Sequence, residues 1–106
     1  MAHTKFNIFT VAGNGTVIDC SSEPFKYFSM QVKGTGAVPT LWTAVLEGTI
    51  DMVNYTTILT HTQAIGDGVV LFLGALPSPV LAYRARVVSL TLGSATNITV
   101  TILGTQ

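Results

Sequence analysis

The chain has 106 residues, of which five are basic and five acidic, so its formal net charge at pH 7 is zero. Charged residues make up 9% of the sequence, whereas an ordinary soluble domain has roughly 25%. Such a chain has no basic field to attract DNA, RNA or an anionic membrane, and we expect direct contact with none of them. The length suits one domain, so we expect residues 1–106 to fold as a single unit.

The single cysteine, Cys20, cannot form a disulfide within the chain, so the fold has to rest on its hydrophobic core. The N-terminus has no cationic segment followed by a long apolar one, and the longest apolar run, residues 69–73, is too short to span a bilayer. We therefore expect a soluble protein that is made in the cytoplasm. Sparse charge provides little repulsion between copies, which favours a protein that works within an assembly.

The N-terminal segment has the alternation of a β-strand. In residues 5–11, Phe6 and Ile8 share one side of the strand, and the residues next to them take the other. The turn-forming sequence AGNG at 12–15 comes next, and a second apolar run follows at 16–20. This pattern predicts strand, turn and strand.

The middle of the chain predicts a β-hairpin. Two runs rich in β-branched and aromatic residues, 41–50 and 55–62, are joined by the short connection DMVN at 51–54. Trp42, the only tryptophan, lies on the more apolar face of the first run. We predict that its side chain is in the core.

Four other segments complete the pattern. Residues 25–33, 80–92 and 97–103 alternate in polarity, while residues 69–73 form a continuous apolar run typical of a buried strand. About eight strands, turn signals at close spacing and no helical period predict an all-β fold. We expect a single antiparallel β-sandwich or jelly-roll-like domain, with a small closed barrel as the alternative.

Residues able to do chemistry are scattered along the sequence. His3 and His61 are the only histidines, and neither has a second His or Cys at ligand spacing, so we expect no metal and no cofactor. His61, between two threonines, is expected to be an ordinary strand residue. The acidic residues lie mostly at strand ends and turns, where carboxylates accept backbone hydrogen bonds, and no spacing pairs two of them for glycoside hydrolysis. We expect a protein that is not an enzyme.

Arg84 and Arg86 are the most informative polar pair. They lie two residues apart, so they share one face of the strand and repel each other unless each finds an acceptor. One interpretation is a contact with another subunit or a partner. The other, which we favour, is cross-strand pairing with Glu47 or Asp51 within the chain.

A resemblance to a known class of proteins follows from four segments. They read FSMQVKGTG (28–36), WTAVLEGTID (42–51), YTTIL (55–59) and YRARV (83–87). From Phe25 onward the chain resembles the small β-sandwich structural proteins of tailed bacteriophages. The resemblance implies a non-enzymatic component of the virion, of the capsid decoration (cement) type, that is made in the host cytoplasm and located on the capsid surface. It also implies a homotrimer that contacts the major capsid protein.

Two alternatives accompany this interpretation. The same segments are similar to discoidin-like and other carbohydrate-binding sandwiches, which implies a glycan-binding module of a phage tail or adhesin. A head-tail neck subunit is the other alternative. Sugar-binding modules usually expose aromatic side chains, whereas alternation here predicts that most aromatics are in the core, namely Phe28, Trp42, Phe72 and Tyr83.

The N-terminal segment is the expected point of contact with a partner. A sandwich exposes sheet edges, and the Lys, Glu and Pro residues that usually protect such edges are few in this sequence. Residues 1–12 could act as a strand or arm that reaches a neighbouring chain, with Phe6 and Ile8 filling apolar pockets. We therefore predict an interface that uses Phe6, Ile8, Arg84 and Arg86.

Overall fold

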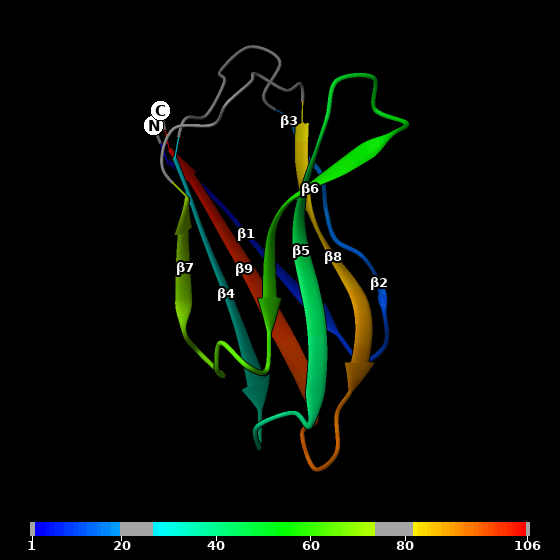
Figure 1. Cartoon of the computed structure of the whole chain (residues 1–106), viewed down its shortest axis with the longest axis vertical. Coiled ribbons are helices and arrows are strands. Elements are labelled where there is room, and N and C mark those ends of the chain that lie inside the picture. The colour runs from blue at the N-terminus through cyan, green and yellow to red at the C-terminus, as the bar shows by residue number, and fades with distance from the viewer. Residues whose placement is uncertain (1, 20–26, 74–81, 106) are drawn as a thin grey trace.

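The computed structural model describes residues 2–19, 27–73 and 82–105, and in these ranges the chain forms nine β-strands and no helix (Figure 1). All the strand pairings are antiparallel. The strands are β1 (Ala2–Phe9), β2 (Gly13–Asn14), β3 (Ile18–Asp19), β4 (Tyr27–Thr35), β5 (Leu41–Thr49), β6 (Tyr55–Thr62), β7 (Val70–Leu73), β8 (Ala82–Thr91) and β9 (Asn97–Thr105).

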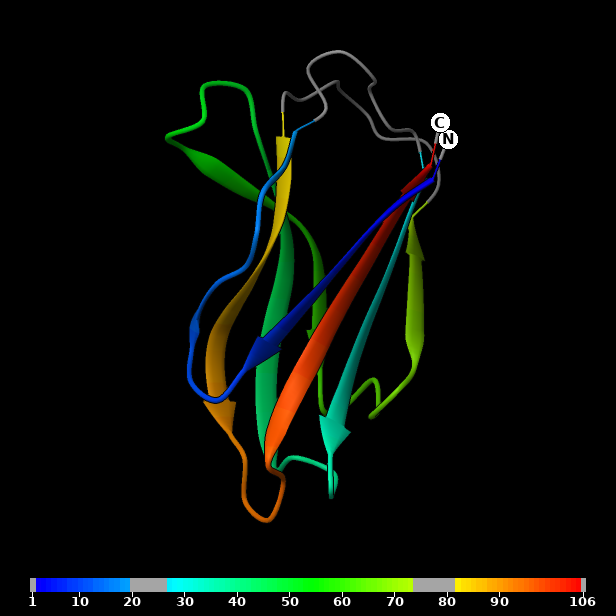
Figure 2. The ribbon, with the colours of Figure 1, turned by 180° about the vertical axis from the view of Figure 1, so that it is seen from behind.

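The strands form two sheets that pack face to face (Figure 2). Sheet A has the order β1-β9-β4-β7, and sheet B has the order β2-β8-β5-β6, with β3 also paired to β8. The β5–β6 hairpin stays within sheet B, while every other connection except that between β2 and β3 passes from one sheet to the other. Counting β2 and β3 as one interrupted strand, this is the connectivity of a jelly roll. The predicted all-β sandwich is therefore confirmed, and a closed barrel is not formed.

The core lies between the inner faces of the two sheets. β4, β8 and β9 contribute every second residue over most of their length, because successive side chains of a strand point to opposite faces. The rings of Phe28 and Tyr83 meet across the core, with centroids 4.2 Å apart. Trp42 is 1% exposed, as predicted. The buried apolar cluster comprises Phe9, Ile18, Phe28, Met30, Val32, Trp42, Ala44, Leu46, Tyr83, Ala85, Val87, Ile98, Val100 and Ile102.

His61 is a core residue, not merely a strand-face residue. It is fully buried and accepts a hydrogen bond at Nδ1 from Trp42 Nε1, at 3.1 Å. Its other nitrogen, Nε2, therefore carries the proton and donates to the carbonyl oxygen of Val69, 2.8 Å away. The imidazole thus pairs the buried indole N–H of Trp42 and links β6 of sheet B to the residue before β7 of sheet A.

The strand, turn and strand predicted near the N-terminus do not lie in one sheet, because β1 lies in sheet A whereas β2 and β3, which follow the turn, lie in sheet B. Asn7 Oδ1 accepts a hydrogen bond from the backbone N–H of Thr16, at 2.8 Å, and so links the two sheets at this side of the sandwich.

The run at 69–73 is not a buried strand. β7 is a short edge strand that pairs with β4, and alternate residues of it project from the outer face of sheet A. Phe72 is 78% exposed, so its predicted place in the core is wrong, whereas Phe28, Trp42 and Tyr83 are buried as expected.

Candidate interaction site

Sheet A carries exposed apolar side chains on its outer face. Phe6 and Ile8 of β1 are 69% and 68% exposed, and Phe72 of β7 is 78% exposed. Val70 is partly exposed beside them, and Leu103 projects from the same side of β9. Large exposed apolar groups gathered on one face make that surface a candidate for contact with another protein. We call Phe6, Ile8, Val70, Phe72 and Leu103 the outer apolar face.

Strand register gathers these residues, although they are far apart in the sequence. Phe6 pairs with Thr101, and Thr101 pairs in turn with Gln31, which lies opposite Val70. The next row runs in the same way from Thr4 through Leu103 and Ser29 to Phe72. The residues of the outer apolar face therefore lie at both edges of sheet A and on β9, with uncharged polar residues between them.

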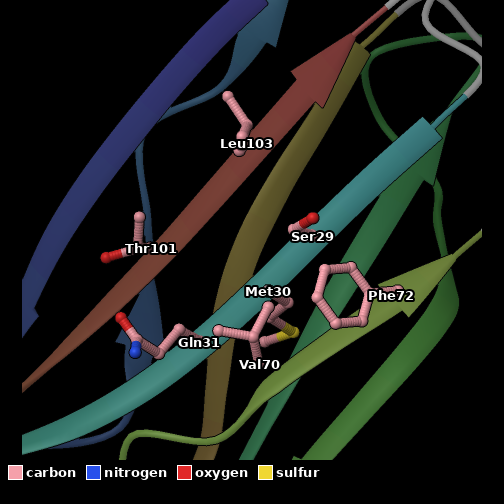
Figure 3. Close-up of a pocket in the computed structure, with 7 residues that line it drawn as sticks. All are labelled: Ser29, Met30, Gln31, Val70, Phe72, Thr101 and Leu103. Carbon is pink, nitrogen blue, oxygen red and sulfur yellow. The ribbon is translucent and has the colours of Figure 1, made fainter.

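A hollow of about 310 Å³ lies in the outer apolar face, between β9, β4 and β7 (Figure 3). Phe72 and Val70 project from β7 along one side of it, and Leu103 and Thr101 from β9 along the other. The lining is mainly apolar, and its polar groups are the uncharged side chains of Ser29, Gln31 and Thr101.

Charge is sparse around this hollow. Lys33 is the one charged residue among the outward-facing positions described on β4, β7 and β9. Its Nζ lies 3.6 Å from Asp67 Oδ2, and its side chain is 64% exposed. The Asp67 carboxylate is fixed by a hydrogen bond from the backbone N–H of Gly34, at 2.6 Å. An apolar partner surface could cover the hollow without burying an unpaired charge.

The outer face of sheet B is organised around an ion-pair cluster. Glu47, whose side chain is 5% exposed, accepts a hydrogen bond from Arg84 Nε at 2.9 Å and lies 3.1 Å from Arg86 Nε. The Arg84 guanidinium also lies over the ring of Tyr55, 3.6 Å from its centroid. Cross-strand pairing with Glu47, the interpretation that we favoured from the sequence, is confirmed, whereas Asp51 takes no part in the pairs.

The connection between β5 and β6 forms an exposed apolar tip, defined here as residues 50–54. Ile50, Met52 and Val53 are 72%, 47% and 76% exposed. Met52 has φ of 64°, a left-handed conformation that residues other than glycine seldom adopt. Such a conformation persists only where its surroundings hold it in place.

Asp51 and Thr49 hold the tip in this conformation. Asp51 Oδ1 accepts hydrogen bonds from the backbone N–H groups of Val53 and Asn54, at 2.9 and 2.7 Å. Thr49 Oγ1 accepts from the backbone N–H of Met52, at 3.0 Å. The hydrogen bonds that Asp51 accepts, led by that from the backbone of Asn54, hold the pKa of Asp51 well below its ordinary value of 3.8. The charged carboxylate is therefore the form that the folded tip favours.

The state of Asp51 predicts a dependence of stability on pH. The folded-state pKa is the lower one, so the unfolded chain takes up the proton first as the pH falls. The stabilising contribution is complete well above 3.8 and declines below it. We expect the melting temperature of Asp51→Asn to lie below that of the wild type at neutral pH, and the difference to shrink as the pH is lowered. A difference that stays constant from neutral to acidic pH would contradict this account.

The predicted interface residues lie on two separate surfaces. Phe6 and Ile8 belong to the outer apolar face of sheet A, while Arg84 and Arg86 lie on sheet B and pair with Glu47. Residues 2–9 form β1, which pairs with β9 of the same chain along its length, so this segment is an edge strand of the fold. Its role as an arm towards a partner stays a prediction, with the exposed side chains as the available contact.

Sequence reasoning missed Phe72, Leu103 and the tip. The alternation of Val70 and Phe72 with two leucines was a signal for an outward-facing pair, but it was hidden within a continuous apolar run. Among the described residues, no three His, Cys, Asp or Glu side chains lie close enough to hold a metal ion. The same part of the chain contains no helix long and apolar enough to cross a membrane.

Comparison with known proteins supports the fold. No protein-family model and no curated protein sequence matches the chain. The crystal structure of YomS, an SPBc2 prophage-derived protein, is similar with a TM-score of 0.66 and 10% sequence identity, over 98% of this chain and 94% of that one. The crystal structure of PirA has a TM-score of 0.49 and 11% identity, over 97% of this chain and 92% of that one. The similarity to YomS shows a shared sandwich fold.

Proposed function

We propose that the protein is a non-enzymatic structural component of a bacteriophage particle, and that it serves as a capsid decoration protein that stabilises the head shell. The observation that carries the proposal is the outer apolar face, where Phe6, Ile8 and Phe72 are more than half exposed on a sheet with little charge. Such a surface suits a lasting contact between proteins.

Two further points support this role. The fold is shared with a prophage-derived protein, and four segments of the sequence resemble small sandwich proteins of tailed phages. In this proposal the protein is made in the host cytoplasm and then joins the capsid surface. There it forms a homotrimer and contacts the major capsid protein, with Phe6 and Ile8 of β1 as contact residues.

Electron microscopy of particles of the phage whose genome encodes the chain tests the proposal. We expect density for the protein on the outer shell, at repeated positions that fit three copies. Heads that lack the protein should bind it when it is added back, and Phe6→Ser should weaken that binding without unfolding the sandwich, because Phe6 is 69% exposed. Density at the neck would instead indicate a neck subunit, and density nowhere on the particle would refute a virion role.

A glycan-binding module is the second candidate function, and Phe72 is the observation that favours it. The sequence pattern predicted that this ring is in the core, where it could not bind a sugar. In the structure the ring is 78% exposed beside Ser29, Gln31 and Thr101. Sugars stack on exposed aromatic rings and bond to neighbouring hydroxyl and amide groups. Binding of a neutral oligosaccharide that is lost in Phe72→Ala, together with no binding to heads, would favour this function over decoration.

A further inference from the structure

We infer that the hairpin tip of one copy inserts into the hollow of the outer apolar face of a second copy, so that the subunits join head to tail. This rests on the proposed function in one respect, which is that the protein works as a homo-oligomer. The tip presents Ile50, Met52 and Val53 to solvent, and the hollow presents Val70, Phe72 and Leu103. Each surface needs an apolar partner, and the chain carries both.

The tip is ready to bind because its shape is fixed in advance. The Thr49 hydroxyl accepts hydrogen bonds from the backbone N–H groups of Asp51 and Met52, and the Asp51 carboxylate accepts from the next two N–H groups. Together they hold the loop with Met52 at positive φ. At its base, Tyr55 pairs with Thr49 and lies under the Arg84 guanidinium. A rigid loop loses little conformational entropy when it binds, so more of its contact energy appears as affinity.

The hollow is suited to this occupant in size and polarity. Its volume of about 310 Å³ exceeds the roughly 150 Å³ that holds a benzene molecule in an engineered apolar cavity, so aliphatic side chains fit. Gln31 Nε2 already donates to the carbonyl oxygen of Gly68, at 2.8 Å, so one N–H of this amide keeps its partner when the hollow is closed.

The charges of the two surfaces are complementary. Asp51 is the one charged residue of the tip, and it stays ionised. Lys33, which follows Gln31 by two positions on the same outer face of β4, lies 3.6 Å from Asp67 and is 64% exposed at its side chain, so an incoming carboxylate would share this lysine with Asp67. An anionic lipid surface would repel this tip, whereas a second copy offers it a lysine. The net charge of zero adds no general repulsion between copies.

The positions of the two surfaces require that the contact join different molecules. The tip projects from sheet B on the far side of the sandwich from β7, as both ribbon views show (Figure 1, Figure 2). Each copy therefore has one free tip and one free hollow, which makes the interface heterologous. Heterologous contacts close into a ring when the rotation between subunits allows it, and a ring of three agrees with the proposed trimer.

A complementation experiment with purified protein tests the inference. The tip variant Val53→Asp places a second negative charge on the tip, and the hollow variant Phe72→Ser removes its aromatic wall. Both side chains are more than three quarters exposed, so both variants should fold, which circular dichroism and thermal melting verify. Met52→Gly provides a second tip variant, because glycine adopts the positive φ without strain and removes only the side chain. Val38→Asp, 63% exposed elsewhere, is the matched control.

Light scattering and sedimentation at micromolar concentration give the readout. The wild type and Val38→Asp should form the same closed oligomer, and the tip and hollow variants should each be monomeric, with self-association weakened by at least about tenfold, as for a loss of about 1.4 kcal/mol. An equal mixture of Val53→Asp and Phe72→Ser should form dimers and stop there, because one intact tip meets one intact hollow.

Three results would overturn the inference: a monomeric wild type, either variant assembling as the wild type does, or a mixture that stays monomeric. The second result, seen for Val53→Asp alone, would indicate that outer apolar faces pack on each other symmetrically. None of them depends on phage particles. If microscopy finds no density on the particle, the complementation result still stands. If complementation fails, the microscopy result still stands.

Discussion

Replacing Trp42 with alanine is expected to lower the free energy of unfolding by roughly 3–5 kcal/mol, the usual cost of removing a large aromatic side chain from a core. Trp42 is 1% exposed and packs between the two sheets. Its indole N–H is also the donor to His61 Nδ1, so the substitution leaves a buried acceptor without a partner. For a domain of this size, such a loss lowers the melting temperature by about 15 °C or more.

Trp42→Phe separates packing from hydrogen bonding. Phenylalanine keeps most of the apolar volume but has no N–H group, so we expect a smaller loss of about 1–3 kcal/mol. Urea unfolding followed by circular dichroism measures both variants, since the only tryptophan is the residue replaced. If Trp42→Ala left the unfolding midpoint unchanged, the core position and the role of His61 would both be contradicted.

Local alternation was sufficient to predict those parts of the fold in which one face of a strand is buried. In β5 and β8 the period of two placed Trp42 in the core and set Arg84 and Arg86 side by side on the opposite face. The pattern predicted an acceptor for the two arginines within the chain, Glu47 or Asp51, and the structure shows that it is Glu47. Each of these inferences needs only residues that are close in sequence, or the pairing of two neighbouring strands.

Sheet membership and exposed apolar surface could not be predicted in this way. Turn-forming residues at 12–15 indicate that the chain reverses, but they carry no information about which sheet receives the next strand. An apolar run such as 69–73 is buried on both faces only if another layer covers the sheet. Here Phe72 is exposed because it lies on the outer face of sheet A, which no other described strand covers.

The candidate interaction site was predicted only in part, for the same reason. Phe6 and Ile8 were recognised from their alternation near the N-terminus, yet Leu103 and Phe72 join them only through the strand order β1-β9-β4-β7. The tip was recognised as a short connection. Its fixed shape depends on hydrogen bonds from Asp51 and Thr49 that composition does not reveal.

The second large effect is expected at Glu47, which holds two arginines on the outer face of sheet B. Its carboxylate is 5% exposed and lies 2.9 Å from Arg84 Nε and 3.1 Å from Arg86 Nε. Glu47→Ala removes both contacts and leaves two guanidinium groups side by side without an acceptor. Hydrogen bonds to charged groups contribute about 1.5–3 kcal/mol each, but Arg86 is 40% exposed and keeps much of its hydration. We therefore expect a loss of about 2–4 kcal/mol.

Glu47→Gln and Lys33→Ala show whether that loss comes from buried charge. Glutamine keeps the shape of the side chain and one acceptor oxygen, but it has no charge. The stability of Glu47→Gln should therefore fall between that of the wild type and that of Glu47→Ala. Lys33 pairs with Asp67 at the surface, with 64% of its side chain exposed, and its removal should cost less than about 1 kcal/mol. Urea unfolding at low and high salt completes the comparison, because salt screens the Lys33 pair more than the buried cluster. Equal losses for Glu47→Ala and Lys33→Ala would show that the cluster contributes no more than an ordinary surface ion pair.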